Sequence, residues 1–361
     1  MPFVAADDLL ERDRELDTLR AGLDRACAGE GTILLIEGPA GAGKTSLAHA
    51  AADQAAMVVL AASGSELERP FGFGVVRQLL EPVVSHEPAN GELFAGGAAP
   101  AARLFAPGGR WPGGADVGFE ALHSLYWLMV NIADRAPTIV LVDDCQWADA
   151  DSLRFLAYLA QRIDGLPVAM LLTGRPDAAE DEGAAVWAQM ASRPAAIVLH
   201  PRPLSRGAVA ALVRERLAAD PAEEFSRACH AATGGNPLFL RELLRSLADE
   251  RVVPSAAAAS QVRAVGPAAV SRFVLHRLAA LGPAATELAR AVAVLGDVTD
   301  PPLAARVSGL DEDAARQAAD DLVRADIFVR SDRLGFVHPI VRAALYEDLA
   351  SRLLLQILSW S

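Results

Sequence analysis

A glycine-rich octet near the start of the chain has the clearest chemical signature. Residues 38–45 have the sequence GPAGAGKT, which fits the pattern G-x-x-x-x-G-K-[ST] at every fixed position. Its glycines let successive backbone N–H groups turn inward toward phosphate oxygens, and its threonine hydroxyl is a ligand for Mg²⁺. We therefore predict a site for the phosphates of ATP or ADP. The predicted contacts are Gly38, Pro39, Ala40, Gly41, Ala42, Gly43, Lys44, Thr45 and Ser46.

Lys44 is the only lysine in the sequence, since the rest of the 33 basic residues are arginines. A lysine that persists in so arginine-rich a chain indicates a chemical requirement for its amine. An ammonium group is a mobile point charge that fits between phosphate oxygens, whereas a guanidinium is bulkier and planar. The composition therefore supports a phosphate-binding role for this residue.

Two carboxylates follow an apolar run later in the chain. Residues 138–144 have the sequence TIVLVDD, in which a predicted strand ends in Asp143 and Asp144. The carboxyl ends of parallel strands face the crevice where ligands bind, so we predict that Asp143 holds Mg²⁺ and Asp144 orients or deprotonates an attacking water. The alternative is an exposed turn, where Asp is common. A later run ends in Thr173 and Arg175; we predict that Arg175 reaches a γ-phosphate, the alternative being a surface arginine.

Short, nearly continuous apolar runs recur through the first half of the chain, as expected of strands that are buried on both faces. Segments with helical patterns lie between them, for example residues 152–163. We predict an α/β P-loop NTPase fold, with a parallel sheet covered by helices. The predicted strands are residues 32–37, 57–62, 138–142, 168–172 and 196–199.

The second half of the chain favours helices. Residues 200–250 have helical patterns interrupted by TGGNP, and residues 252–269 resemble a connector. Helices at about 270–280, 284–295, 301–308 and 312–325 precede a predicted hairpin at 327–338 and a final helix, which is the order expected of a winged helix. The predicted domains are a P-loop ATP-binding domain (1–200), an α-helical lid (201–262), a winged-helix domain (263–350) and an apolar tail (351–361).

Composition excludes several classes of protein. The formal net charge of −13 disfavours binding to a nucleic acid backbone, and the three cysteines lack the spacing of a disulfide framework or a zinc site. The acidic N-terminal segment does not resemble a signal peptide, and no long uninterrupted apolar run is present, so we expect a cytoplasmic protein that does not enter a membrane. The apolar tail suits either a partner-seeking helix or a truncated reading frame.

Seven segments occur in an order that resembles one family. They are LLERDRELDTL, GPAGAGKTSL, SELERPFGFGVVRQLL, IVLVDDCQWAD, LLTGRP, TGGNPLFLREL and FVHPIVRAALYEDL. Together they resemble the signal-transduction ATPases with numerous domains (STAND), and most closely the ATP-binding region of large LuxR-type transcriptional regulators. The resemblance spans about residues 9–350. It implies a nucleotide-binding core, a helical lid and a winged helix that closes over the nucleotide.

The resemblance also implies roles for residues that have ordinary explanations when taken singly. It implies that Arg12 and Pro237 border the adenine and ribose, that Arg175 senses the γ-phosphate, and that His338 contacts the phosphates. The family continues into a helical-repeat sensor and a DNA-binding helix-turn-helix, neither of which is found in the printed sequence.

These observations predict an ATP-driven switch that hydrolyses ATP slowly and uses Mg²⁺. A protein partner or self-association through the winged helix or the apolar tail is expected. Direct DNA binding is not, because residues 312–325 carry two arginines against four acidic residues. The alternatives are a P-loop kinase that transfers the γ-phosphate to a small substrate, and DNA binding through the winged helix.

Overall fold

The structure is a computed structural model, and by its contacts the chain divides into two units. The first consists of Met1–Gly38 and Gly43–Pro201, and the second of Pro39–Ala42 and Arg202–Ser361. The predicted four-part division of the chain stays a prediction. The structure describes residues 9–65, 68–85, 88, 91–106, 109, 118–175, 182–262, 275, 278–296, 299–325, 327–329, 332–336, 341–342, 345–346 and 349.

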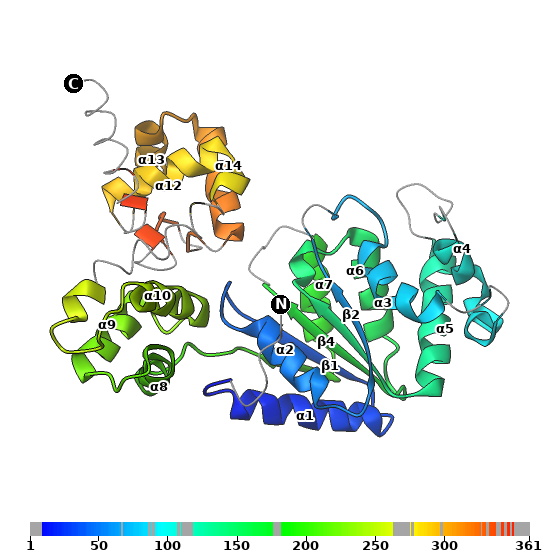
Figure 1. Ribbon diagram of the computed structural model, residues 1–361. Helices are drawn as coiled ribbons and strands as arrows, with labels where there is room; N and C mark the ends of the chain where they lie inside the picture. Colours follow the sequence, from blue (N-terminus) through cyan, green and yellow to red (C-terminus); the bar gives the residue numbers. More distant parts are fainter. Residues whose placement is uncertain are drawn as a thin grey trace. The chain divides into compact units, whose positions relative to one another are not determined.

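A parallel sheet of five strands forms the centre of the described first unit (Figure 1). The strand order is β2-β3-β4-β1-β5, so β4 lies between β1 and β3. In this register Leu34 of β1 and Leu141 of β3 both pair with Leu171 of β4. The predicted P-loop NTPase-like α/β fold with a parallel sheet is confirmed. The strands are β1 (Thr32–Glu37), β2 (Val58–Ser63), β3 (Thr138–Asp143), β4 (Val168–Gly174) and β5 (Ala196–Leu199).

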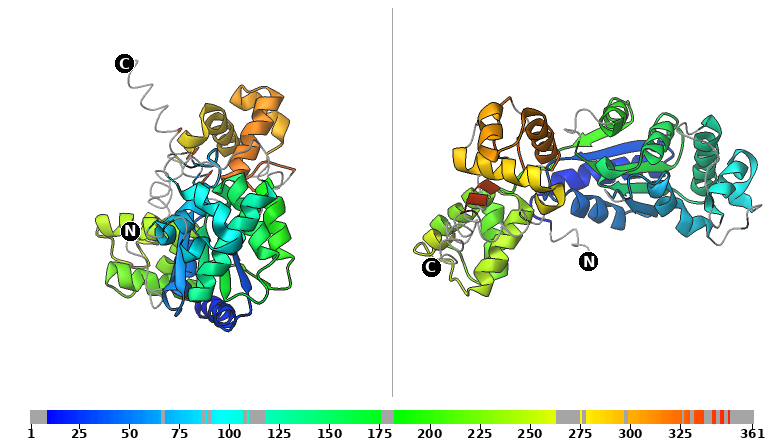
Figure 2. Two further views of the ribbon diagram at one scale, coloured as in Figure 1. Left: turned by 90° about the vertical axis from the view of Figure 1, so that its right-hand side faces the viewer. Right: turned by 90° about the horizontal axis from the view of Figure 1, so that it is seen from above.

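Helices cover both faces of this sheet (Figures 1 and 2). Alternate strand residues point to opposite faces, so Leu34 and Ile36 pack under α1 and α2, while Ile33 and Leu35 pack on the other side. Both faces are buried, which explains the continuous apolar runs. The first face is covered by α1 (Asp13–Cys27) and α2 (Lys44–Asp53), and the second by α3 (Gly74–Val84), α5 (Phe119–Arg135), α6 (Ala150–Ala160) and α7 (Glu182–Ala191). Shorter turns are η2 (Glu92–Phe94), η3 (Gly96–Ala101), α4 (Ala102–Phe105) and η4 (Cys145–Trp147).

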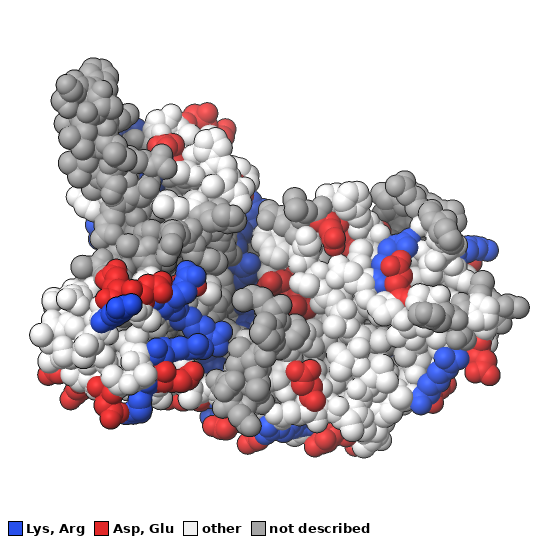
Figure 3. Space-filling view, viewed as in Figure 1, with Lys and Arg blue, Asp and Glu red and all other residues white. Residues whose placement is uncertain are grey.

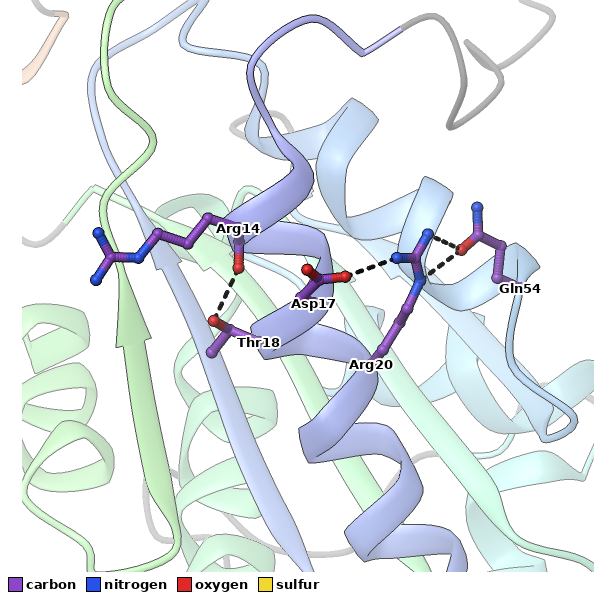
Figure 4. A network of polar contacts seen from close by, with 5 residues as sticks. All are labelled: Arg14, Asp17, Thr18, Arg20 and Gln54. Atoms are coloured by element: carbon purple, nitrogen blue, oxygen red, sulfur yellow. Dashed lines mark hydrogen bonds and ion pairs between the residues drawn. The ribbon is translucent and has the colours of Figure 1, made fainter.

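A polar network on the surface links α1 to the end of α2 (Figure 4). Arg20 donates from Nε and Nη2 to Oε1 of Gln54, at 2.8 and 2.6 Å, and its Nη1 pairs with Asp17 at 2.9 Å. Thr18 donates to the carbonyl of Arg14 at 2.9 Å. Exposed pairs of this kind contribute little to stability, so the apolar face of α1 must supply most of its attachment to the sheet.

The described second unit is largely helical. Three of its helices begin at side chains that accept from first-turn N–H groups, namely Ser205, Asn236 and Asp311. Antiparallel bridges join Thr299 to Leu334 and Phe328 to Phe336. The helices are α8 (Arg206–Leu217), α9 (Glu223–Thr233), α10 (Pro237–Asp249), α12 (Pro283–Leu295), α13 (Pro301–Ser308) and α14 (Glu312–Arg324).

Much of the predicted C-terminal structure lies outside the described residues, including parts of the hairpin at 327–338 and the tail at 351–361. The winged helix therefore stays a prediction. Within the part of the chain that is described, no helix is both long and apolar enough to cross a membrane.

Gly31, which precedes β1, tests the packing of this sheet. A Cβ atom there would lie 2.0 Å from the backbone carbonyl oxygen of Ile163, which cannot move aside as a side chain could. We expect Gly31→Ala to lower the free energy of unfolding by about 1–3 kcal/mol or more. Thermal unfolding followed by circular dichroism measures the change. Gly118→Ala is the matched control, because no atom lies within 4 Å of its Cβ position; equal melting temperatures for the two variants would contradict the packing described.

Candidate functional site

The phosphate loop connects the end of β1 to the start of α2. Gly41 and Gly43 have φ values of 77° and 88°, in the left-handed region that favours glycine. Gly43 is the N-cap of α2, and the first turn of that helix contains no acidic residue. The N–H groups at this helix start therefore keep their partial positive charge, which suits an anionic ligand.

Lys44, the first residue of α2, folds back over the loop. Its side-chain Nζ donates to the carbonyl oxygen of Gly38 at 2.8 Å, and the residue is only 7% exposed. The ammonium group is thus held at the loop, within reach of any phosphate bound there.

Asp143, the last residue of β3, is the centre of the polar cluster. Thr45 donates its hydroxyl to both carboxylate oxygens, at 3.1 Å to Oδ1 and 2.8 Å to Oδ2. Thr173, which is fully buried near the end of β4, donates to Oδ1 at 2.5 Å. The structure therefore brings together Thr45 and Asp143, the two residues predicted to hold a metal ion.

Asp144 follows in a left-handed backbone conformation, with φ 50°. Its N–H donates to Oγ1 of Thr173 at 3.0 Å, and its Oδ1 accepts from Nε2 of Gln146 at 2.7 Å. Thr173 thus touches both predicted acidic residues. Thr173 was expected at this sheet edge without a role, and Gln146 was not predicted. A buried hydroxyl at the end of an apolar strand is the signal that could have marked Thr173.

Cys145 lies beneath this segment and is not a nucleophile. Burial raises the pKa of its thiol well above the usual value, and the charges of Asp143 and Asp144 raise it further. Its Sγ points to the carbonyl of Val142 at 3.6 Å. A buried thiol with a raised pKa is a poor nucleophile and a poor metal ligand, so the oxygen atoms of this cluster are better suited to bind a ligand.

Two further groups lie at the carboxyl ends of the strands. The guanidinium carbon of Arg175 is 5.9 Å from the ring centroid of Trp147, within cation–π range. Glu37, directly before the phosphate loop, accepts from Nε1 of Trp187 at 2.6 Å and contacts Nε2 of His200 at 2.9 Å. Arg175 therefore lies beside the segment that follows Asp144, as a residue at this edge should.

The remaining predicted contacts are placed as follows. Arg12 precedes α1, is 4% exposed and donates to the carbonyl of Glu11. Burial lowers the pKa of its guanidinium, and the charges of Glu15 and Glu11 act in the opposite direction. Pro237 begins α10 in the second unit, where Nδ2 of the preceding Asn236 donates to the carbonyl of Ala40 at 3.0 Å. His338 lies outside the described residues.

The donor set suits one kind of metal ion. No group of three or more His, Cys, Asp and Glu side chains that could hold a metal occurs among the described residues. A threonine hydroxyl with one aspartate matches Mg²⁺, which keeps several waters and takes its other ligands from phosphates.

Two ranges of the chain match known families. Residues 8–172 match the AAA ATPase domain family. The matched range covers the phosphate loop, β3 and most of β4, and it contains the whole Thr45–Asp143 pair. Residues 205–259 match a family described as a domain of unknown function.

Similar proteins extend over nearly the whole chain. An uncharacterised protein of Rhizobium meliloti (strain 1021) is 28% identical over 94% of this chain, which spans about a third (35%) of that protein's length. The structure of a Walker-type ATPase of Pyrococcus abyssi has a TM-score of 0.63 at 16% identity, covering 96% of this chain and 98% of that one. A STAND protein with a tetratricopeptide repeat sensor from Pyrococcus horikoshii has a TM-score of 0.38 at 16% identity, covering 96% and 43%. At such identities the structural likeness shows the fold alone.

Thr173 provides a test of the polar cluster. Thr173→Val keeps the shape but removes the hydroxyl, leaving the Asp144 N–H without its acceptor and the Asp143 carboxylate with Thr45 but not Thr173 as a donor. We expect a loss of about 1–3 kcal/mol in stability, seen as a lower melting temperature. Thr173→Ser keeps the hydroxyl and loses one buried methyl group, about 1 kcal/mol. A valine variant as stable as the wild-type chain would show that these hydrogen bonds contribute nothing.

Proposed function

We propose that this chain binds ATP with Mg²⁺ and hydrolyses it slowly, as the switch module of a STAND regulator of the LuxR type. The observation that carries the proposal is the Thr45–Asp143 pair beneath the phosphate loop of an AAA ATPase domain. Lys44 would contact the β- and γ-phosphates, and Thr45 with Asp143 would hold the metal ion, directly or through water. Bound Mg²⁺ would neutralise charge that develops on the phosphates.

Hydrolysis would use the residues around the metal site. Asp144 would orient or deprotonate the attacking water, and Arg175 would stabilise charge on the γ-phosphate. Arg12 and Pro237 are proposed to border the adenine and ribose, and His338 to contact the phosphates, on the strength of the family resemblance. The burial of Arg12 is compatible with a role in a binding site rather than on a solvated helix surface.

The regulatory part of the proposal concerns the second unit. We propose that residues 201–262 form a helical lid and residues 263–350 a winged helix, whose arrangement depends on whether ATP or ADP is bound. The exposed apolar side chains Val294 and Val307, 55% and 50% exposed on α12 and α13, favour a protein partner or a second copy of the chain.

Direct DNA binding is a weaker alternative. Both arginines of α14 are paired with acidic neighbours on the same helix, Arg316 with Asp313 and Arg324 with Asp321. In the view of Figure 3, basic side chains lie among acidic ones over the described surface. Phosphate contacts would need these pairs to break. The kinase alternative gains no support either, because none of the similar proteins above is described as a kinase.

The single lysine gives a direct test of ATP binding. An amine-reactive ester can acylate only Lys44 and the α-amino group of the chain. We expect MgATP at ten times its Kd to reduce acylation of Lys44 about tenfold, because about one site in ten stays free. Peptide mass spectrometry measures both products, and the α-amino group is the internal control. Equal acylation of Lys44 with and without ATP would contradict binding at this loop.

Asp144 provides a test of hydrolysis that is separate from binding. Asp144→Asn keeps the hydrogen bond to Gln146 within reach but removes the charge needed to activate water. We expect the rate of phosphate release to fall by about 100-fold or more while ATP binding is retained. Single-turnover measurements with radiolabelled ATP give the rate. An unchanged rate would remove Asp144 from the mechanism, and labelled phosphate on a small molecule would favour the kinase alternative.

A further inference from the structure

The chain that leaves β2 packs against the segment that follows Asp143. Gly64 extends the backbone hydrogen bonding between β2 and β3, since its N–H donates to the carbonyl of Asp143 at 2.9 Å. A Cβ atom at Gly64 would lie 2.4 Å from the carbonyl oxygen of Asp144 and 2.9 Å from the N atom of Ala148. The two segments therefore touch backbone to backbone, and a side chain at position 64 would force them apart.

Asp149 links the start of α3 to the start of α6 through hydrogen bonds. Its side chain, on a residue 3% exposed, accepts from the backbone N–H of Phe73 at 2.7 Å, of Val75 at 3.3 Å and of Ser152 at 2.9 Å. Ser152 in turn accepts from the N–H of Val76 at 3.1 Å. The first N–H groups of α3, which have no partner in their own helix, are thus satisfied by residues more than 70 positions away in the sequence. Bonds to an ionised carboxylate are stronger than neutral ones.

Two glycines of the PFGFG sequence lie against the same acidic segment. A Cβ atom at Gly72 would be 2.5 Å from Oδ2 of Asp151, and one at Gly74 would be 3.5 Å from Oδ2 of Asp149. Phe73 between them is buried, with φ 62° in the left-handed region. The FGFG and ADADS sequences are therefore complementary in shape, and backbone N–H groups of the first region donate to a carboxylate of the second, which accounts for a motif that nucleotide binding leaves unexplained.

We infer that Asp149 is a positioning residue for Asp144; this inference rests on the proposed hydrolysis. Asp144 has a backbone conformation that non-glycine residues seldom adopt, so the surrounding structure must hold it. Thr173 accepts from its N–H on one side. On the other side, a single turn connects Asp144 to Asp149. The N–H of Trp147 donates to the carbonyl of Asp144 at 2.9 Å and closes this turn.

Asp149→Asn is the substitution that tests this role with least change in volume. It replaces one acceptor oxygen by an NH₂ group, so the side chain loses either the bond from Val75 to Oδ2 or the bonds from Phe73 and Ser152 to Oδ1. The turn is then free to shift, and Asp144 with it. Because displacements of about 1 Å can cost up to about 100-fold in rate, we expect kcat to fall by about 10- to 100-fold. The KM for ATP should change less than about twofold, because the contacts of Lys44 and Thr45 do not involve Asp149.

Asp311→Asn is the matched control. Asp311 is also an N-cap aspartate, accepting from the N–H of Ala314 at 2.8 Å at the start of α14. It undergoes the same chemical change in the other unit, so it reports the cost of a weakened cap alone. We expect it to lower the melting temperature without changing kcat. An unchanged kcat in Asp149→Asn, or an equal loss in both variants, would overturn the positioning role.

Hydrogen exchange without nucleotide separates this inference from the proposed function. In Asp149→Asn, amides 73–76 and 144–148 should lose protection while amides 43–47 keep theirs. If that pattern appears but the wild-type chain releases no phosphate, the proposed hydrolysis fails and the structural coupling stands. If amides 144–148 keep their protection, the inference fails.

Should Asp149→Asn not fold, Ser152→Ala is the second variant. It removes only the acceptor for the N–H of Val76 and should show a smaller loss of kcat in the same direction. No loss would also overturn the inference.

Discussion

The carboxylate of Asp143 holds the candidate site together, because it joins three segments that are distant in sequence. It accepts from Thr45 at the start of α2 and from Thr173 near the end of β4. This is possible because β4 lies between β1 and β3, so the ends of all three strands meet at one edge of the sheet. In a half-buried position these bonds are stronger than in water, and leaving the carboxylate without donors would be costly. The contact of Thr45 with the end of β3 therefore depends on this one group.

Around that carboxylate, the predicted catalytic and phosphate-binding residues have different kinds of contact. Asp144 is held by Thr173 and Gln146, and the turn after it by Asp149. Lys44 donates to a neutral carbonyl of its own loop. A bound phosphate would offer it a charged acceptor, and charge-assisted bonds are roughly twice as strong. The arrangement thus combines a preorganised edge with one cation that can exchange a backbone oxygen for a ligand oxygen.

The sequence predicted the parts of this site that depend on local spacing. Strand β3 and the loop from Gly38 to Thr45 follow from an apolar run and a glycine pattern, which operate over a few residues. The bond from Thr173 to Asp143 could not be predicted in the same way, because it depends on the position of β4 in the sheet. Helix α3 was not assigned at all. The N-cap residue of α3, Phe73, has no side chain that can cap the helix. The carboxylate of Asp149 accepts from the backbone N–H of Phe73 instead.

The single lysine of the chain can now be understood from its surroundings. Lys44 is almost fully buried, yet its ammonium reaches the Gly38 carbonyl six residues back across a tight loop. A guanidinium in the same place would bring five N–H donors on a rigid plane, and a loop of small residues offers few acceptors for them. Unsatisfied donors in a buried position cost free energy, whereas an ammonium can turn its three donors toward whichever oxygens are present. Arginine is therefore disfavoured at the phosphate loop, although it is the common basic residue elsewhere in this sequence.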